Sequence, residues 1–288
     1  MPADTAATTL DDVPAEPGAS KHDPILVADD IRKTFGGLVA VDVEHLEVPR
    51  GVITALIGPN GAGKSTFFNL VSGFDDPDRG QWSFDGQEIS SKGAHTIANM
   101  GMVRTFQLTK SLMKMSVIDN MLLAAPEQRG ERFVASLLPW TWRSQEQDVE
   151  QRADELLDRF GLSRMRDDYA GTLSGGQRKL LEMARALMVN PRLIMLDEPM
   201  AGVNPALTQS LLEHVTALPD DGTTVLFVEH DMDVVMDISD WVVVMAEGRV
   251  IAEGRPNDIT SNRAVIDAYL GEHHGESATA RDVEETDR

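Results

Sequence analysis

Nine consecutive residues of this chain have the composition and spacing of a phosphate-binding loop. The segment Gly58-Pro59-Asn60-Gly61-Ala62-Gly63-Lys64-Ser65-Thr66 matches the pattern G-x-x-x-x-G-K-[ST] at every fixed position. Glycines in such a loop let successive backbone N–H groups face a polyphosphate, and the following helix adds the positive end of its dipole. We expect Lys64 to contact the β and γ phosphates and the Ser65 hydroxyl to bind a bridging Mg²⁺. The segment therefore predicts a nucleotide site.

Two carboxylates follow an apolar run in Leu193-Ile194-Met195-Leu196-Asp197-Glu198. An apolar strand that ends in carboxylates is what a magnesium nucleotide site at the edge of a parallel sheet requires. We expect Asp197 to hold Mg²⁺ or its water shell. Glu198 is expected on the opposite side of the strand's pleat, as general base for the water that attacks the γ phosphate. The alternative, an N-cap pair for a helix near Pro205, is disfavoured because Asn204 is the better cap.

Two further polar residues are candidates because of the motifs around them. His230 directly follows the apolar run 224–229, which places it at the end of a predicted strand. A lone histidine there is more often structural than catalytic. Gln107 lies in Arg104-Thr105-Phe106-Gln107, and its side-chain carbonyl could bind Mg²⁺ or the attacking water. Neither residue would be singled out without the phosphate loop and the acidic pair.

The elements that must position these groups are visible as alternating apolar patterns. Buried parallel strands are predicted at Val52–Ile57, Leu193–Leu196, Thr224–Val228 and Trp241–Met245. Apolar positions at a spacing of 3.6 predict helices at Lys64–Gly73, Gln145–Phe160, Gly176–Val189, Pro205–Leu218 and Met232–Ile238. This alternation indicates an α/β fold. The mostly helical block at about 108–172 breaks the alternation and predicts an inserted subdomain.

Composition excludes several classes of protein. The 288 residues contain 47 acids against 26 Lys and Arg, a net charge of −21, and no cysteine. A nucleic-acid partner is not expected for so acidic a chain, and disulfides and thiolate metal sites are excluded. The N-terminus lacks the pattern of a secretory signal, so we expect a cytoplasmic chain. Residues 1–24 and 272–288 are predicted to be disordered acidic tails around a folded region at 25–271.

A second glycine-rich motif decides the family resemblance. Leu173-Ser174-Gly175-Gly176-Gln177 precedes a predicted helix, which by itself indicates an N-cap at Ser174 and another anion cradle. With the phosphate loop, Gln107, the acidic pair and His230 in this order, the chain resembles an ABC-type ATPase from about Ile25 to Leu270. The resemblance implies a P-loop fold with a RecA-like parallel-sheet core, an antiparallel β subdomain and the inserted helical subdomain. It also implies ATP and Mg²⁺ as ligands.

The resemblance implies a role for the second cradle and for one aromatic residue. Cassettes of this family pair head to tail, so Ser174, Gly175, Gly176 and Gln177 of one subunit would cover the γ phosphate in the partner. Phe35, in Lys33-Thr34-Phe35-Gly36-Gly37, stands where the family stacks an aromatic ring, commonly Tyr, on adenine. Phe keeps the ring face and loses only the hydroxyl. The alternative reading of Phe35 is an ordinary strand aromatic.

One branch of the family matches best. Ala201-Gly202-Val203-Asn204-Pro205 replaces the Ser-Ala-Leu-Asp of many cassettes and resembles subunits that energise branched-chain amino acid import. The stretches 35–41, 228–236 and 265–272 agree, although urea-import and lipopolysaccharide-export cassettes are similar. The resemblance implies docking on permease subunits at the cytoplasmic face of the cell membrane, beside a second cassette and, indirectly, a substrate-binding protein. A soluble ABC ATPase in iron–sulfur assembly is the alternative that these stretches oppose.

Overall fold

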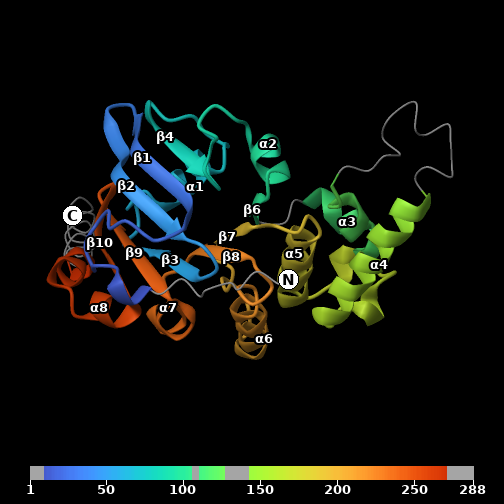
Figure 1. The fold of residues 1–288 in the computed structure, drawn as a ribbon. Coiled ribbons are helices and arrows are strands. Elements are labelled where there is room, and N and C mark those ends of the chain that lie inside the picture. The colour runs from blue at the N-terminus through green and yellow to red at the C-terminus, as the bar shows by residue number, and fades with distance from the viewer. Residues whose placement is uncertain (1–9, 106–109, 127–142, 271–288) are drawn as a thin grey trace, which may run out of the picture. The chain divides into compact units, whose positions relative to one another are not determined.

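The computed structural model describes residues 10–105, 110–126 and 143–270, which fall into two compact units (Figure 1). The first unit joins residues 1–94 with 224–288, and the second consists of residues 95–223. The chain therefore leaves the first unit after its first third and returns to it at β8. The second unit includes the residues expected to form a helical block, 108–172, but extends beyond them at both ends.

One sheet of the first unit is antiparallel, with the strand order β2-β1-β4-β5. Its strands are β1 (Pro24–Phe35), β2 (Leu38–Pro49), β4 (Arg79–Phe84) and β5 (Gln87–Glu88). β1 and β2 form a long hairpin that turns at Gly36 and Gly37, both with positive φ, so that Phe35 lies opposite Leu38. The antiparallel β subdomain implied by the family resemblance is thus present, although no periodicity had predicted these strands.

The other sheet of the first unit has the order β10-β9-β3-β8. Its strands are β3 (Ile53–Ile57), β8 (Thr224–Val228), β9 (Trp241–Ala246) and β10 (Arg249–Gly254). β3 pairs in parallel with both β8 and β9, and β10 is antiparallel to β9. Every residue of β3 and β8 is buried, as expected for strands covered on both faces. The helices are α1 (Lys64–Val71), α7 (Met232–Ile238), α8 (Pro256–Thr260) and a last helix at 263–270.

The second unit combines one parallel strand pair with most of the helices. β6 (Met102–Arg104) lies parallel to β7 (Leu193–Asp197), with Arg104 opposite Met195. The α-helices that belong to it are α2 (Ala94–Asn99), α3 (Val117–Leu123), α4 (Arg143–Arg159), α5 (Gly175–Leu187) and α6 (Pro205–Thr216). Short 3₁₀ turns lie at Lys110–Lys114, Ser163–Met165 and Ala170–Thr172. The predicted helices α4, α5 and α6 are confirmed to within a few residues at each end.

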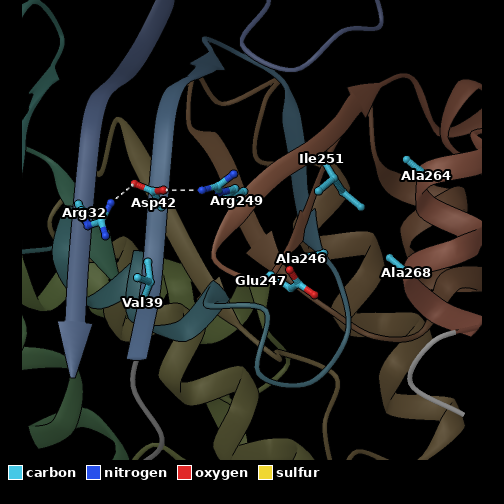
Figure 2. A pocket seen from close by; sticks show the side chains of 9 residues that line it. All are labelled: Arg32, Val39, Asp42, Ala246, Glu247, Arg249, Ile251, Ala264 and Ala268. Carbon is cyan, nitrogen blue, oxygen red and sulfur yellow. Dashed lines mark hydrogen bonds and ion pairs between the residues drawn. The ribbon is translucent and has the colours of Figure 1, made fainter. Parts of the chain in front are cut away.

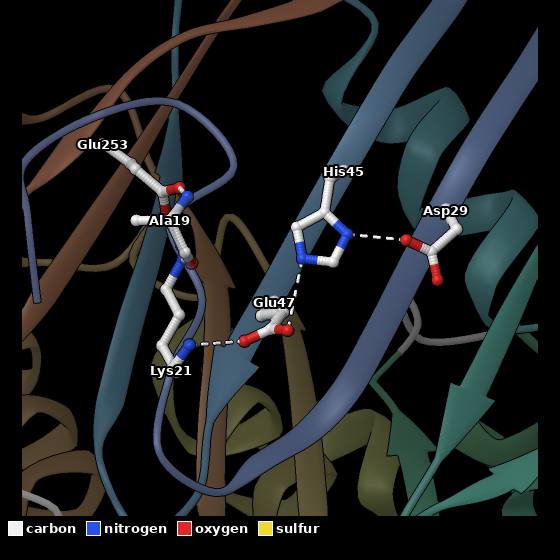
Figure 3. A network of polar contacts seen from close by, with 6 residues as sticks. All are labelled: Ala19, Lys21, Asp29, His45, Glu47 and Glu253. Atoms are coloured by element: carbon white, nitrogen blue, oxygen red, sulfur yellow. Dashed lines mark hydrogen bonds and ion pairs between the residues drawn. The ribbon is translucent and has the colours of Figure 1, made fainter.

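The N-terminal segment differs from the sequence-based expectation over residues 10–23. The mobile tail was predicted to reach about Pro24, but Leu10–Asp12 forms a 3₁₀ turn and Ala19 and Lys21 are buried. The Lys21 ammonium pairs with Glu253 at 2.5 Å, and both side chains are at most 1% exposed. Glu253, which lies beside Ala19 and Lys21 in Figure 3, also accepts a bond from the Ala19 N–H. It accepts a further bond from the Trp241 indole N–H. A buried carboxylate needs such partners, and they hold this segment against the sheet.

Over residues 10–105, 110–126 and 143–270, none of the helices combines the length and the apolar composition needed to cross a bilayer.

Candidate functional site

The phosphate loop lies between β3 and α1, and its glycines are required by close backbone contacts. A Cβ atom on Gly58 would lie 1.9 Å from the Met245 carbonyl oxygen, and one on Gly63 would lie 2.2 Å from that of Ala40. Both glycines have positive φ, 145° and 95°. Only glycine fits either position without moving a neighbouring strand. The fixed glycines of the motif therefore bring the loop backbone close to β9 and β2.

Lys64 begins α1 and bends back over the loop. Its ammonium donates to the carbonyl oxygens of Gly58 at 2.7 Å and Pro59 at 2.9 Å, and the residue is buried. Ser65 is exposed in the first helical turn, where N–H groups lack partners within the helix. A phosphate oxygen is a charged acceptor and binds an ammonium more strongly than a carbonyl does. The loop thus offers a cation, a hydroxyl and backbone donors to one anion.

His230 lies at the same edge of the sheet as the phosphate loop. β3 and β8 are in parallel register, with Leu56 opposite Val228, so the residues after both strands leave the sheet at the same end. Glu229 is buried, whereas His230 is exposed. Asp231 caps α7 by accepting from the N–H groups of Asp233 and Val234. This cap fixes the backbone next to the histidine. The structure therefore places His230 and the phosphate loop on one edge of the first unit.

Phe35 presents its ring to solvent at the end of the β1–β2 hairpin. It is 50% exposed, unlike the buried aromatic side chains of the strands, such as Phe84 and Trp241. The Lys33 ammonium lies 5.1 Å from the ring centroid and also bonds Asp75 at 2.8 Å. An exposed ring on a well-paired hairpin is suited to stacking on a flat ligand. This exposure argues against the reading of Phe35 as an ordinary strand aromatic.

The acidic pair of the second unit is placed by β7, but one prediction about it is wrong. Asp197 is the last residue of β7, after four buried apolar residues. Glu198 lies outside the strand with φ of 47°, so the alternation of a pleat does not set its direction. Positive φ is uncommon and strained for a residue with a side chain, and such strain is concentrated at functional sites. The backbone therefore leaves the strand direction at Glu198, directly after Asp197.

Arg104 is a neighbour of Asp197 that the sequence analysis gave no role. Its guanidinium lies 2.7 Å from the Asp197 carboxylate, and its side chain is 8% exposed. The parallel register of β6 with β7 brings the two together across 93 positions of sequence. The only local signal is an arginine at the end of a short apolar strand. Any cation bound by Asp197 therefore shares this carboxylate with Arg104 or displaces it.

The glycine-rich motif before α5 is a well-formed helix start. Ser174 is the N-cap, and its hydroxyl accepts a hydrogen bond from the Gln177 N–H. The Gln177 side-chain oxygen accepts in return from the Ser174 N–H, which completes a capping box. A Cβ on Gly176 would lie 2.7 Å from a Leu207 methyl carbon, so this glycine allows close packing against α6. Gly175 has open space around it apart from Arg178. Asn204 caps α6 as predicted, accepting from the Leu207 N–H. Gln107 lies outside the described residues.

The oxygen donors present fit a hard cation that takes further ligands from a nucleotide. Ser65 offers a hydroxyl and Asp197 a carboxylate, the ligand types that Mg²⁺ prefers. In the described part of the chain, no group of three or more His, Cys, Asp or Glu side chains could hold a metal without such help. Each of these two residues, taken in its own unit, is therefore a ligand type suited to a metal that arrives with phosphate oxygens.

Comparison with known proteins identifies the family. The model for "ABC transporter" matches residues 41–201, and that for "Branched-chain amino acid ATP-binding cassette transporter" matches 249–275. The chain belongs to the ABC transporter family. It is thus an ATPase cassette with a nucleotide site and an α/β P-loop fold. The matched segment 41–201 contains the phosphate loop, the acidic pair and the Ser174–Gln177 motif.

Relatives of this ABC cassette match it over almost the whole of their own length. A protein of Archaeoglobus fulgidus, named "Probable branched-chain amino acid transport ATP-binding protein LivG", is 44% identical over 88% of this chain and 97% of its own. The Pseudomonas aeruginosa protein "High-affinity branched-chain amino acid transport ATP-binding protein BraF" is 41% identical over 86% and 98%. A crystal structure of a nucleotide-free ATP-binding cassette from an ABC transporter superposes with a TM-score of 0.75 at 39% identity, covering 85% of this chain and 98% of that one.

Proposed function

We propose that this chain is the ATP-hydrolysing subunit of an importer of branched-chain amino acids. The observation that carries the proposal is similarity over 86–88% of this chain, at 39–44% identity, to cassettes named for this transport. The match of residues 249–275 to the branched-chain amino acid cassette model supports the same branch. Since these relatives are subunits of membrane transporters, we place the chain at the cytoplasmic face of the membrane, bound to permease subunits.

Nucleotide binding is assigned to the phosphate loop and to Phe35. Phe35 stacks on adenine, the loop amides and Lys64 hold the phosphates, and Ser65 with Asp197 and Gln107 binds Mg²⁺. The ion, when bound, neutralises charge on the β and γ phosphates and orients them. The exposed Phe35 ring and the Lys64 ammonium at the loop support these roles.

Hydrolysis is assigned to residues at the ends of β7 and β8. The Glu198 carboxylate accepts a proton from the water that attacks the γ phosphate. His230 orients that water and the phosphate from the edge of the sheet that also carries the phosphate loop. Gln107 links the nucleotide to the helical block through the segment after β6. The strained backbone of Glu198 supports a role at the reacting centre.

We expect Arg104→Gln to lower the Mg²⁺ concentration needed for tight nucleotide binding several-fold. The guanidinium is the partner of Asp197 at 2.7 Å, and removing it frees this carboxylate for the metal. ADP affinity measured across a Mg²⁺ titration checks the shift. Arg159→Gln is the matched control, because Arg159 forms a similar pair with Asp221 at 2.6 Å outside the acidic pair. A raised Mg²⁺ requirement would instead mean that Arg104 orients Asp197 for metal binding.

The active unit is proposed to be a head-to-tail pair of cassettes. A Ser174→Arg chain mixed with a Lys64→Ala chain then forms dimers with one composite site that carries both defects and one that carries neither. Where two copies of this chain pair, we expect the mixture to hydrolyse ATP faster than either variant alone. Steady-state ATPase rates of purified mixed dimers check this. No complementation in a verified mixed dimer would place the Ser174 motif in its own chain's site.

Transport itself is tested by uptake into reconstituted vesicles. With the cognate permease subunits, cassettes and binding protein, we expect ATP-dependent uptake of leucine. Gln107→Ala is expected to reduce uptake more than basal ATP hydrolysis, since Gln107 is assigned to coupling. Equal losses of both activities would make Gln107 a catalytic residue only. An active complex that takes up no leucine, isoleucine or valine would remove the substrate assignment.

A further inference from the structure

The first unit contains a cavity of about 510 Å³ that the nucleotide chemistry does not use. Figure 2 shows that its lining comes from β1, β2, the β9–β10 turn, β10 and the helix at 263–270. None of its lining residues belongs to the phosphate loop, and Phe35 and His230 do not line it. Several lie in residues 249–275, the segment matched by the branched-chain amino acid cassette model. The cavity is therefore a separate feature in a branch-specific part of the chain.

One wall of the cavity carries Arg249, which has N–H donors that its ion pair with Asp42 does not use. The Asp42 carboxylate accepts from Arg32 at 3.3 Å and from Arg249 at 3.1 Å (Figure 2). Arg79 is a more distant partner of Asp42 at 3.8 Å and pairs with Asp30. The Arg249 side chain is 68% exposed, and its pair with Asp42 uses one terminal nitrogen. Most of its five N–H donors thus remain available to a carboxylate.

A carboxylate lies close to this arginine in sequence and on the same cavity. Glu247 is the first central residue of the tight β9–β10 turn, where Glu247 and Gly248 have φ of 50° and 81°. These angles are those of a type I′ hairpin turn, and this turn fixes the backbone position from which the Glu247 side chain extends. Within the described residues its carboxylate takes part in no ion pair. It is therefore an acceptor for a cationic group of a ligand.

The remaining lining is apolar and the charges balance. Ile251 on β10 and two alanines, Ala264 and Ala268, form the side opposite the charged wall (Figure 2). Two arginines and two carboxylates line the cavity, so its formal charge is zero. A site without net charge does not favour a phosphate or a nucleotide. Separate positive and negative groups beside an apolar wall instead match a zwitterion with an aliphatic side chain.

We propose that this cavity binds a free α-amino acid with an aliphatic side chain. The ligand's carboxylate pairs with Arg249, its ammonium with Glu247, and its side chain packs on Ile251 and the alanines of helix 263–270. The proposed transport explains why a cassette would sense this class of molecule, and to that extent the inference rests on the proposed function. The lining chemistry alone specifies the ligand class.

The cavity is connected to the phosphate loop through backbone hydrogen bonds. The Gly248 N–H donates to the Ala62 carbonyl at 3.1 Å, and the Gly248 carbonyl accepts from the Asp42 N–H at 2.7 Å. An amino acid held by Glu247 and Arg249 therefore restrains the turn that supports the loop. Binding of the amino acid and of the nucleotide is then linked, and each changes the other's affinity by the same factor.

The test is a titration of the purified full-length chain with leucine, in which binding is measured by ligand-observed NMR. We expect saturable binding with a Kd on the order of 1 mM, because the ligand is small and the cavity is partly open. Isoamylamine lacks the carboxylate and 4-methylpentanoate lacks the ammonium, so each is expected to bind at least about tenfold more weakly. Glycine, which lacks the aliphatic side chain, is expected to bind more weakly as well.

Variants locate the site and separate this proposal from the transport assignment. Arg249→Gln and Glu247→Gln are expected to weaken leucine binding at least about tenfold while the fold is retained, because both side chains are exposed. Arg255→Gln, which alters a pair with Asp11 outside the cavity, is the control. No saturable leucine binding, or binding that these two variants leave unchanged, overturns the inference. Because titration needs no permease, its outcome is independent of the uptake experiment.

Discussion

Glu198→Gln is expected to abolish ATP turnover and leave nucleotide binding intact. The substitution removes the carboxylate that we propose accepts the water's proton, and a general base contributes about 10²–10⁴-fold to rate. Lys64, Ser65 and the loop backbone are unchanged, so the nucleotide is still held and the closed pair of cassettes accumulates. Gln is close in size to Glu and can adopt the same backbone turn, where φ is 47°. The loss is therefore chemical and not structural.

Single-turnover hydrolysis and ADP affinity, measured on the same preparation, check this separation. Glu213→Gln is a suitable control, because Glu213 is an exposed carboxylate on α6 in the same unit. We expect the control to hydrolyse ATP at the rate of the unmodified protein. Turnover of the Glu198→Gln protein within about tenfold of that rate would show that another group accepts the proton.

The parts of the site that sequence predicted best are those determined by neighbouring residues. The phosphate loop needs glycine at Gly58 and Gly63, where an added Cβ would lie 1.9 Å and 2.2 Å from carbonyl oxygens of other segments, so its motif is visible in nine residues. Ser174 and Asn204 are caps whose partners lie three residues further on. The buried strands β3, β7, β8 and β9 are recognisable in the sequence as short apolar runs. Local constraints of this kind leave a local pattern.

The parts that sequence missed depend on partners far along the chain or on backbone angles. Arg104 meets Asp197 only because β6 and β7 are parallel, and Lys21 meets Glu253 across 232 positions. The segment 10–23 has no apolar period because polar contacts to the sheet anchor it. Positive φ at Glu198 leaves no periodic signal, so the pleat prediction for this residue was wrong. These features follow from tertiary pairing, which overrides local pattern.

Lys64→Ala is expected to weaken nucleotide binding itself. A hydrogen bond to a charged group is worth about 1.5–3 kcal/mol, so the dissociation constant should rise by roughly 10–150-fold. The ammonium lies on the phosphate loop, bonded to the Gly58 and Pro59 carbonyls, and a phosphate would replace these neutral acceptors with charged ones. Turnover falls as well, since less nucleotide is bound and its γ phosphate is poorly oriented.

ADP affinity by calorimetry checks this prediction, with Lys92→Ala as the control for loss of one lysine outside the loop. The alanine chain also loses two internal bonds of Lys64, so thermal unfolding without nucleotide must be measured beside binding. A folded Lys64→Ala protein with unchanged ADP affinity would remove Lys64 from the phosphate site. Together with Glu198→Gln, the variant separates binding from chemistry: loss of affinity at Lys64 and loss of turnover alone at Glu198 are different defects.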